Sequence, residues 1–150
     1  MLLVCLGNIC RSPLAEVIMR KQAMAMQLDQ IFEFASAGTG DWHLGKGADP
    51  RSIRIAKKYH LSLHQHQAQH ITSRSINDWD CLIAMDQNNK SDLLKMGVAQ
   101  EKLLLMRQFE GSDPIKDVPD PYYGGEKGFE TIYQLLQNNA GLMLHHLSTA

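Results

Sequence analysis

Residues 2–13 read Leu-Leu-Val-Cys-Leu-Gly-Asn-Ile-Cys-Arg-Ser-Pro, an apolar run that leads into a cysteine, five further residues, an arginine and Ser-Pro. The apolar run predicts a strand that ends at Cys5. Ser12 and Pro13 are typical of a helix start, because serine caps helix N-termini and proline suits the first turn. The residues between them must therefore form a tight loop at a helix N-terminus, where oriented backbone N–H groups bind anions.

Two side chains of this loop have the chemistry of a phosphate site. The positive potential of a helix N-terminus and the guanidinium of Arg11 both favour the thiolate form of Cys5, which is the nucleophile. The planar fork of Arg11 can donate to two oxygens of one phosphoryl group. The alternative is that Cys5 is a core residue, as free cysteines often are. The Gly-Asn turn and the helix start that follow favour the phosphate site.

The overall composition is that of an ordinary globular protein. The chain has 150 residues, 44% of them hydrophobic, and a formal net charge of -1. We expect a single domain over residues 1–150, because this length buries a sizeable core. The balanced charge argues against nucleic acid as the main partner, and the apolar runs are too short to cross a membrane. Three cysteines and the lack of a signal-peptide pattern predict a cytoplasmic protein.

Segments with strand and helix patterns alternate along the chain. The strand candidates are 2–5, 31–36, 80–85 and 102–109, and the helix candidates are 14–28, 49–59, 86–94 and 129–147. Such alternation predicts an α/β fold, in which helices cover a mostly parallel sheet. Ligands of these sheets bind at the carboxyl ends of strands near a topological switch point, which is where Cys5 is expected.

Four stretches of the chain resemble one known family. Residues 5–13 (CLGNICRSP) look like the signature of the low-molecular-weight protein tyrosine phosphatases, and residues 120–123 (DPYY) resemble their general-acid loop. Residues 36–39 (SAGT) with Trp42 resemble the second strand and the cleft wall, and residues 84–86 (AMD) a strand-to-helix turn. The resemblance covers essentially the whole chain. It implies a four-stranded parallel sheet with helices on both faces and the phosphate loop between the first strand and the first helix.

The resemblance also implies an activity, which is hydrolysis of phosphotyrosine and small aryl phosphates. Cys5 would form a phosphocysteine intermediate, Arg11 would bind the phosphoryl group, and Asp120 would act first as general acid and then as base. The alternative for Asp120 is that Asp-Pro merely starts a turn. No cofactor is implied. The expected partner is a phosphotyrosine-containing protein, and for bacterial members of the family this is often a tyrosine kinase. Inorganic phosphate or similar oxyanions are expected to act as inhibitors.

Further residues are expected to bind the substrate. The loop residues whose backbone would surround the phosphoryl oxygens are Leu6, Gly7, Asn8, Ile9, Cys10 and Ser12. Ser12 can also donate its hydroxyl to the sulfur of Cys5. Trp42, Tyr122 and Tyr123 would form walls for an aryl ring, which would favour phosphotyrosine over the shorter phosphoserine. For Trp42, simple packing is the alternative.

Other residues are expected to support the loop. By resemblance, Asn8 would brace it in a left-handed conformation, with Ser36 and His66 as its partners and Asp86 nearby. Cys10 would trap an oxidised Cys5 as a reversible disulfide; alternatively, it is a loop residue without a redox role. Cys81 is interpreted as a core residue.

Three competing interpretations remain open. A metal site at His64, His66 and His70 is disfavoured, because no cysteine or carboxylate nearby completes a ligand set. An arsenate reductase of the same fold would need further cysteines downstream, and only Cys81 follows the loop. A catalytically silent phosphotyrosine-binding module would need neither the nucleophile nor the acid, yet both are present.

Overall fold

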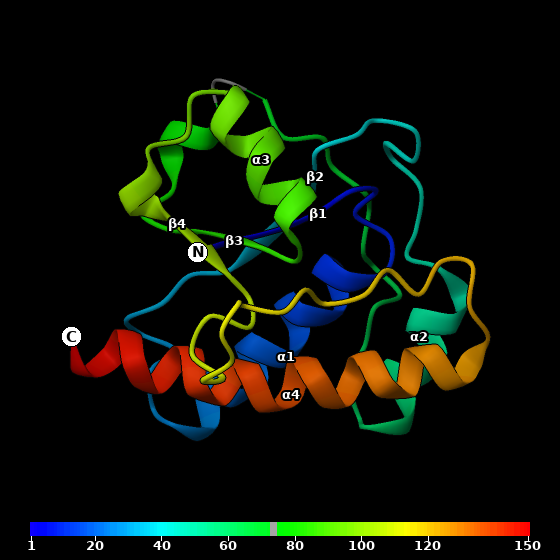
Figure 1. Cartoon of the computed structure of the whole chain (residues 1–150). Helices are drawn as coiled ribbons and strands as arrows, with labels where there is room; N and C mark the ends of the chain where they lie inside the picture. The colour runs from blue at the N-terminus through cyan, green and yellow to red at the C-terminus, as the bar shows by residue number, and fades with distance from the viewer. Residues whose placement is uncertain (73–74) are drawn as a thin grey trace.

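The computed structural model describes residues 1–72 and 75–150 and contains one four-stranded parallel sheet (Figure 1). Its strand order is β2-β1-β3-β4, and each neighbouring pair is parallel. The strands are β1 (Leu2–Cys5), β2 (Ala35–Gly38), β3 (Leu82–Ala84) and β4 (Leu103–Leu105). Because β1 has β2 on one side and β3 on the other, Cys5 lies at the point where the strand order reverses. This is the position at which ligands bind in such sheets.

Helices cover both faces of the sheet, as predicted (Figure 1). They are α1 (Arg11–Ala25), α2 (Pro50–Lys58), α3 (Gln87–Lys95) and α4 (Glu126–Thr149), with two short 3-10 turns at Ser75–Asp78 and Gln100–Lys102. Helix α4 packs along α1 and also contacts α2 on one face, whereas α3 packs against β3 and β4 on the other. Residues 6–10, within the predicted phosphate loop, connect β1 directly to α1.

The sheet is buried on both faces, which explains why its strands are apolar throughout. Leu3 and Ile83 belong to the core that α1 and α4 complete, whereas Leu2, Val4 and Leu82 belong to the second core, beneath α3. This alternation follows from the two-residue period of a strand. Side chains on either side of β1 therefore fix the strand whose last residue is Cys5.

Some element boundaries differ from the predictions. The second strand was expected over 31–36, but Ile31 is 69% exposed and its N–H donates to Leu28 O in a turn after α1. Pairing with β1 starts only at Ala35 and continues to Gly38. Helix α1 begins at Arg11 with Cys10 as its N-cap residue, so the prediction that Ser12 caps it is wrong. The Ser12 hydroxyl is used inside the loop instead.

Other helix ends follow the predicted chemistry. Asp49 caps α2 by accepting a hydrogen bond from Arg51 N at 2.8 Å, and Pro50 is the first helical residue. Asp86 caps α3 by accepting from Asn89 N at 2.7 Å. Gly97 follows α3 with φ 96°, a left-handed conformation that glycine adopts readily. These caps place two carboxylates, those of Asp49 and Asp86, beside the phosphate loop.

Candidate active site

The phosphate loop, residues 5–12, curls around the sulfur of Cys5. The Cys5 side chain is buried, and its Sγ lies 2.9 Å from Ser12 Oγ and 3.3 Å from the N–H of Asn8. Asn8 has φ 55°, the left-handed conformation that was predicted. A backbone N–H and a hydroxyl therefore both face the sulfur, which is the arrangement that stabilises a thiolate.

The side chain and carbonyl of Asn8 tie the loop to distant parts of the chain. Its Nδ2 donates to Ser12 Oγ at 2.8 Å, its Oδ1 accepts from Gln69 N at 2.8 Å, and its carbonyl accepts from His66 Nε2 at 2.7 Å. The expected contact with His66 is thus present. The expected contact with Ser36 is not among the hydrogen bonds of the described residues, because Ser36 Oγ donates to Glu16 Oε2 at 2.7 Å.

Arg11 is a buried cation held by several acceptors. Its Nη1 donates to Asp86 Oδ2 at 2.6 Å and to Val118 O at 3.0 Å, and its Nη2 reaches Asp120 Oδ2 at 3.5 Å. Burial acts to lower the pKa of Arg11, but the negative charges of Cys5 and the carboxylates outweigh it, so the pKa is raised. The guanidinium is therefore permanently charged and fixed in orientation beside the sulfur.

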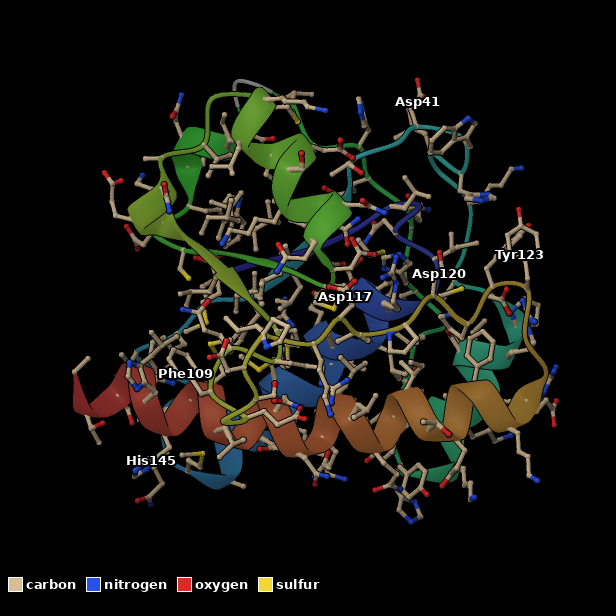
Figure 2. All side chains as sticks on the ribbon, in the orientation of Figure 1. Asp41, Phe109, Asp117, Asp120, Tyr123 and His145 are labelled. Carbon is tan, nitrogen blue, oxygen red and sulfur yellow. The ribbon has the colours of Figure 1, made fainter. Side chains whose placement is uncertain are left out.

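Asp120 belongs to residues 117–124, which we call the acid loop after the resemblance of its DPYY stretch and which passes the N-terminal end of α1 (Figure 2). Its side chain is 42% exposed. Its Oδ1 accepts from the N–H of Tyr122 at 3.0 Å, while its Oδ2 faces Arg11. The structure thus brings Asp120 to the loop that holds Cys5, although the two residues are 115 positions apart in the sequence.

These groups open into one cavity of about 340 Å³, within the usual size range of small-molecule sites. Trp42 is 66% exposed and its ring lies against Gly40, where an added Cβ would come within 1.9 Å of it. Trp42 is thus a rim residue, not a core residue. The described residues that line the cavity are Cys5, Leu6, Gly7, Ile9, Cys10, Arg11, Trp42, His43, Asp120, Tyr122 and Tyr123.

Several predicted residues are not among the described residues that line this cavity. Asn8, Ser12, His66 and Asp86 support the loop or Arg11, as described above. Cys10 shares the cavity with Cys5, and burial, followed by the charge of Asp49, raises the pKa of its thiol. The redox role of Cys10 stays a prediction.

The prediction that Cys81 is a core residue is only partly confirmed. Its side chain is half-buried and packs against the core cluster. Burial raises the pKa of this thiol.

The histidine-rich segment does not form a metal cluster within the residues that the structure describes. His66 Nε2 bonds the carbonyl of Asn8, and His70 Nε2 bonds the carbonyl of Thr39. None of the helices in residues 1–72 and 75–150 combines the length and apolar content that crossing a membrane requires.

Four further residues of the site were missed by the sequence analysis. His43 lines the cavity, 6.0 Å from the ring of Tyr122, and Gln69 holds Asn8 through its backbone. Arg51 and Arg107 donate to carbonyls of the acid loop. Of these four residues, only Arg51 had a signal in the sequence, because it follows the predicted helix cap Asp49 by two residues.

Comparison with known proteins supports the architecture over the whole chain. Residues 1–150 match the family model described as low molecular weight phosphotyrosine protein phosphatase. A relative of that name from Schizosaccharomyces pombe is 36% identical over 135 residues, which are 88% of this chain and 86% of the relative.

Solved structures give the same result. The protein tyrosine phosphatase of Entamoeba histolytica, solved with Hepes in its active site, superposes with a TM-score of 0.90 at 36% identity, covering 99% of this chain and 96% of that one. The tyrosine phosphatase Wzb from Escherichia coli K30, in complex with sulphate, has a TM-score of 0.83 at 29% identity and covers 97% and 96% of the two chains.

Proposed function

Because the chain belongs to the low molecular weight phosphotyrosine protein phosphatase family, we propose that it hydrolyses phosphotyrosine and small aryl phosphates through a phosphocysteine on Cys5. The observation that carries the proposal is the convergence of Cys5, Arg11 and Asp120 on one cavity. Hydrolysis of a phosphate monoester needs a nucleophile, donors for the phosphoryl oxygens and a proton for the leaving oxygen. These three residues supply one each, and residues 1–150 act as one phosphatase domain.

The first step transfers the phosphoryl group to the enzyme. The thiolate of Cys5 attacks phosphorus, the bond from phosphorus to the phenolic oxygen breaks, and Asp120 gives its proton to that oxygen. Arg11 and the loop N–H groups hold the three equatorial oxygens. Asp86, 2.6 Å from Arg11, keeps the guanidinium pointing at the phosphoryl group.

The second step releases inorganic phosphate. Asp120, now ionised, takes a proton from a water molecule, the water oxygen bonds to phosphorus, and the phosphorus–sulfur bond breaks. The electron pair of that bond returns to Cys5 as a thiolate. Ser12 Oγ, 2.9 Å from the sulfur, donates its hydroxyl to this developing charge.

The aromatic rim favours an aryl ester. Trp42, Tyr122 and Tyr123 stand around the cavity in which Cys5 is buried. A phosphotyrosine side chain reaches from this rim to the sulfur, whereas the shorter phosphoserine does not. The partner is then a phosphotyrosine-containing protein, with a bacterial tyrosine kinase as a candidate. Inorganic phosphate and similar oxyanions act as inhibitors, in keeping with the sulphate bound by the related Wzb protein.

The test compares wild type and Cys5→Ser with p-nitrophenyl phosphate, a phosphotyrosine peptide and a phosphoserine peptide. We expect wild type to hydrolyse only the two aryl substrates and Cys5→Ser to lose turnover while it still binds inorganic phosphate. Equal turnover by folded Cys5→Ser would contradict the role of Cys5. A folded wild type that binds phosphate or arsenate without turnover would support a silent binding module or an arsenate reductase instead, and arsenate reduction in the same protein would separate these two.

A further inference from the structure

Arg51, on the first turn of α2, is bonded to the acid loop through both of its terminal nitrogens. Its Nη1 donates to Gly124 O at 2.6 Å and its Nη2 to Tyr122 O at 2.7 Å. The two carbonyls are separated by one residue, so a single planar guanidinium fixes both ends of a short backbone segment. Arg51 is not among the described residues that line the cavity, so it contacts the loop from outside.

The segment held by Arg51 also orients the general acid. The N–H of Tyr122 donates to Asp120 Oδ1 at 3.0 Å, while the carbonyl of the same residue accepts from Arg51. The N–H of Gly124 donates to Pro121 O at 2.9 Å and closes the turn that contains these groups. Moving the carbonyl of Tyr122 therefore moves the donor that orients the Asp120 carboxylate.

Arg51 is itself fixed in position by Asp49. Asp49 Oδ1 accepts from Arg51 Nε at 3.0 Å and its Oδ2 from Arg51 Nη2 at 2.9 Å, a bidentate pair. The pKa of Asp49 is lowered, because its bonds to Arg51 outweigh the opposing effect of burial. The N–H of Asp49 donates to Ile9 O at 2.9 Å, which anchors the pair to the phosphate loop. A continuous set of bonds thus runs from the loop of the nucleophile to the loop of the acid.

We propose that Arg51, oriented by Asp49, is a positioning residue that holds Asp120 in register with the phosphate loop for protonation of the leaving group. This inference rests on the proposed function, and it adds the residue that positions the carboxyl group of Asp120. The side chain of Arg51 also lies over the ring of Phe129 on α4, with the guanidinium carbon 4.7 Å from the ring centroid. The Arg51–Asp49 pair therefore contacts α4 as well as the two loops.

The geometry requires arginine specifically. The four bonds, two to Asp49 and two to carbonyls, use four of the five N–H donors of a planar guanidinium, whereas a lysine ammonium can make at most three bonds in another geometry. We therefore test Arg51→Lys, which keeps the charge, and Arg51→Gln, which removes it. Arg54→Gln is the matched control, because Arg54 lies on the same helix, is 58% exposed and pairs only with Glu126 among the described residues.

The readout is how kcat/KM depends on the leaving group. A phenolate that leaves readily, such as p-nitrophenolate, needs little protonation, whereas the phenolate of phenyl phosphate needs the acid. For both Arg51 variants we expect kcat/KM for phenyl phosphate to fall about 10-fold or more, with a change of about 3-fold or less for p-nitrophenyl phosphate. Inhibition by inorganic phosphate should be unchanged, because Arg11 and the loop remain intact. Arg54→Gln should match wild type in every measurement.

A double variant excludes a merely structural role. If Arg51 acts through Asp120, then Arg51→Gln should add almost nothing to the loss already caused by Asp120→Asn. Equal losses for both substrates, a weakened affinity for phosphate, or additive effects in the double variant would overturn the proposal. If Arg51→Gln does not fold, Arg51→Lys decides by the same criteria. Inactivity of wild type towards all aryl phosphates would instead refute the proposed function itself.

Discussion

Ser12 sits between Cys5 and Asn8. The amide Nδ2 of Asn8 donates to Ser12 Oγ, which leaves the hydroxyl hydrogen for Cys5 Sγ at 2.9 Å or for the carbonyl of Ala37 at 3.5 Å, and the mechanism proposed above uses the shorter contact. In the proposed mechanism, a hydrogen bond from the Ser12 hydroxyl stabilises the Cys5 thiolate most while the sulfur departs from phosphorus. Hydrogen bonds to charged groups contribute about 1.5–3 kcal/mol, which corresponds to about 10- to 150-fold in rate.

Ser12→Ala should therefore slow the breakdown of the phosphocysteine about 10- to 100-fold. Formation of the intermediate should be affected less, so rapid mixing with p-nitrophenyl phosphate should show a burst of p-nitrophenol followed by slow steady turnover. Ser148→Ala, at an exposed serine near the end of α4, is the control. An unchanged steady rate without a burst would show that the Ser12 hydroxyl does not assist the leaving thiolate.

Asp120→Asn removes the proton that the proposed mechanism gives to the leaving oxygen, and it keeps the shape of the side chain. The asparagine Oδ1 can still accept from the N–H of Tyr122, as Asp120 does at 3.0 Å, so the loop should keep its conformation. We expect kcat/KM for phenyl phosphate to fall by about 10²- to 10⁴-fold, with a smaller loss for p-nitrophenyl phosphate. Parallel kinetics with the two substrates provide the measurement, and equal losses would assign Asp120 a role other than proton donation.

At the residue scale, the sequence predicted the groups whose chemistry lies in their own type and local spacing. The conformation of Asn8 and its bond to His66 were expected and are present. The prediction that Ser36 is a partner of Asn8 was wrong, because the Ser36 hydroxyl donates to Glu16 on α1. Gln69 was missed because it contributes only its backbone N–H, and no residue type signals the direction of a peptide group.

At the scale of elements, the acid loop lacks regular secondary structure and is held by three arginines. Arg107 Nη1 donates to Asp117 O at 2.9 Å, Arg11 Nη1 to Val118 O at 3.0 Å, and Arg51 to the carbonyls of Tyr122 and Gly124. Arg107 is in turn oriented by Glu110, whose Oε2 accepts from Arg107 Nε at 2.7 Å and from Asn139 Nδ2 at 3.0 Å. The start of the acid loop thus depends on a charged pair outside the active site.

This pair should make part of the stability depend on pH. Arg107 is the main cause that lowers the pKa of Glu110 from 4.5 to about 2. Because the pKa is lowered in the folded state, the pair stabilises fully above the unfolded value and loses its effect as the pH falls towards the folded value. Glu110→Gln should lower Tm by about 2–4 °C at pH 7, and the difference from wild type should shrink between pH 4.5 and pH 3.

Thermal unfolding at several pH values measures this difference. Glu101→Gln, at an exposed carboxylate in the 3-10 turn before β4, is a suitable control. A Tm difference that stays constant down to pH 3 would mean that the charge of Glu110 contributes nothing beyond packing.

Helices were easier to predict than strand limits, for a physical reason. Caps such as Asp49 and Asp86 act locally, and the apolar stripe of α4 repeats over many turns. Strand β2 begins and ends where β1 is available as a partner, which local patterning cannot show. The acid loop was recognised from the DPYY stretch, but Arg51 and Arg107, which hold it from elsewhere in the chain, were not.

At the scale of the whole molecule, α4 closes the core on the face of the sheet that carries α1. Leu136 is fully buried on this helix and belongs to the larger core cluster, whereas Leu142 on the same helix is 42% exposed. Leu136→Ala should destabilise the protein by about 2–5 kcal/mol, and Leu142→Ala by about 0.5 kcal/mol or less. Urea unfolding of the two variants measures both values, and similar costs would mean that α4 is not docked as described.

The bonds of Asn8 to Gln69 and of Arg11 to Asp86 and Val118 join segments that are far apart along the chain. Every strand pair is parallel, so these segments meet only after long loops have closed. We therefore expect the proposed oxyanion site to be absent from the denatured ensemble and to be completed late in folding. A bound oxyanion should then stabilise the native state by mass action and act mainly by slowing unfolding, while the rate at which the chain folds should stay nearly the same.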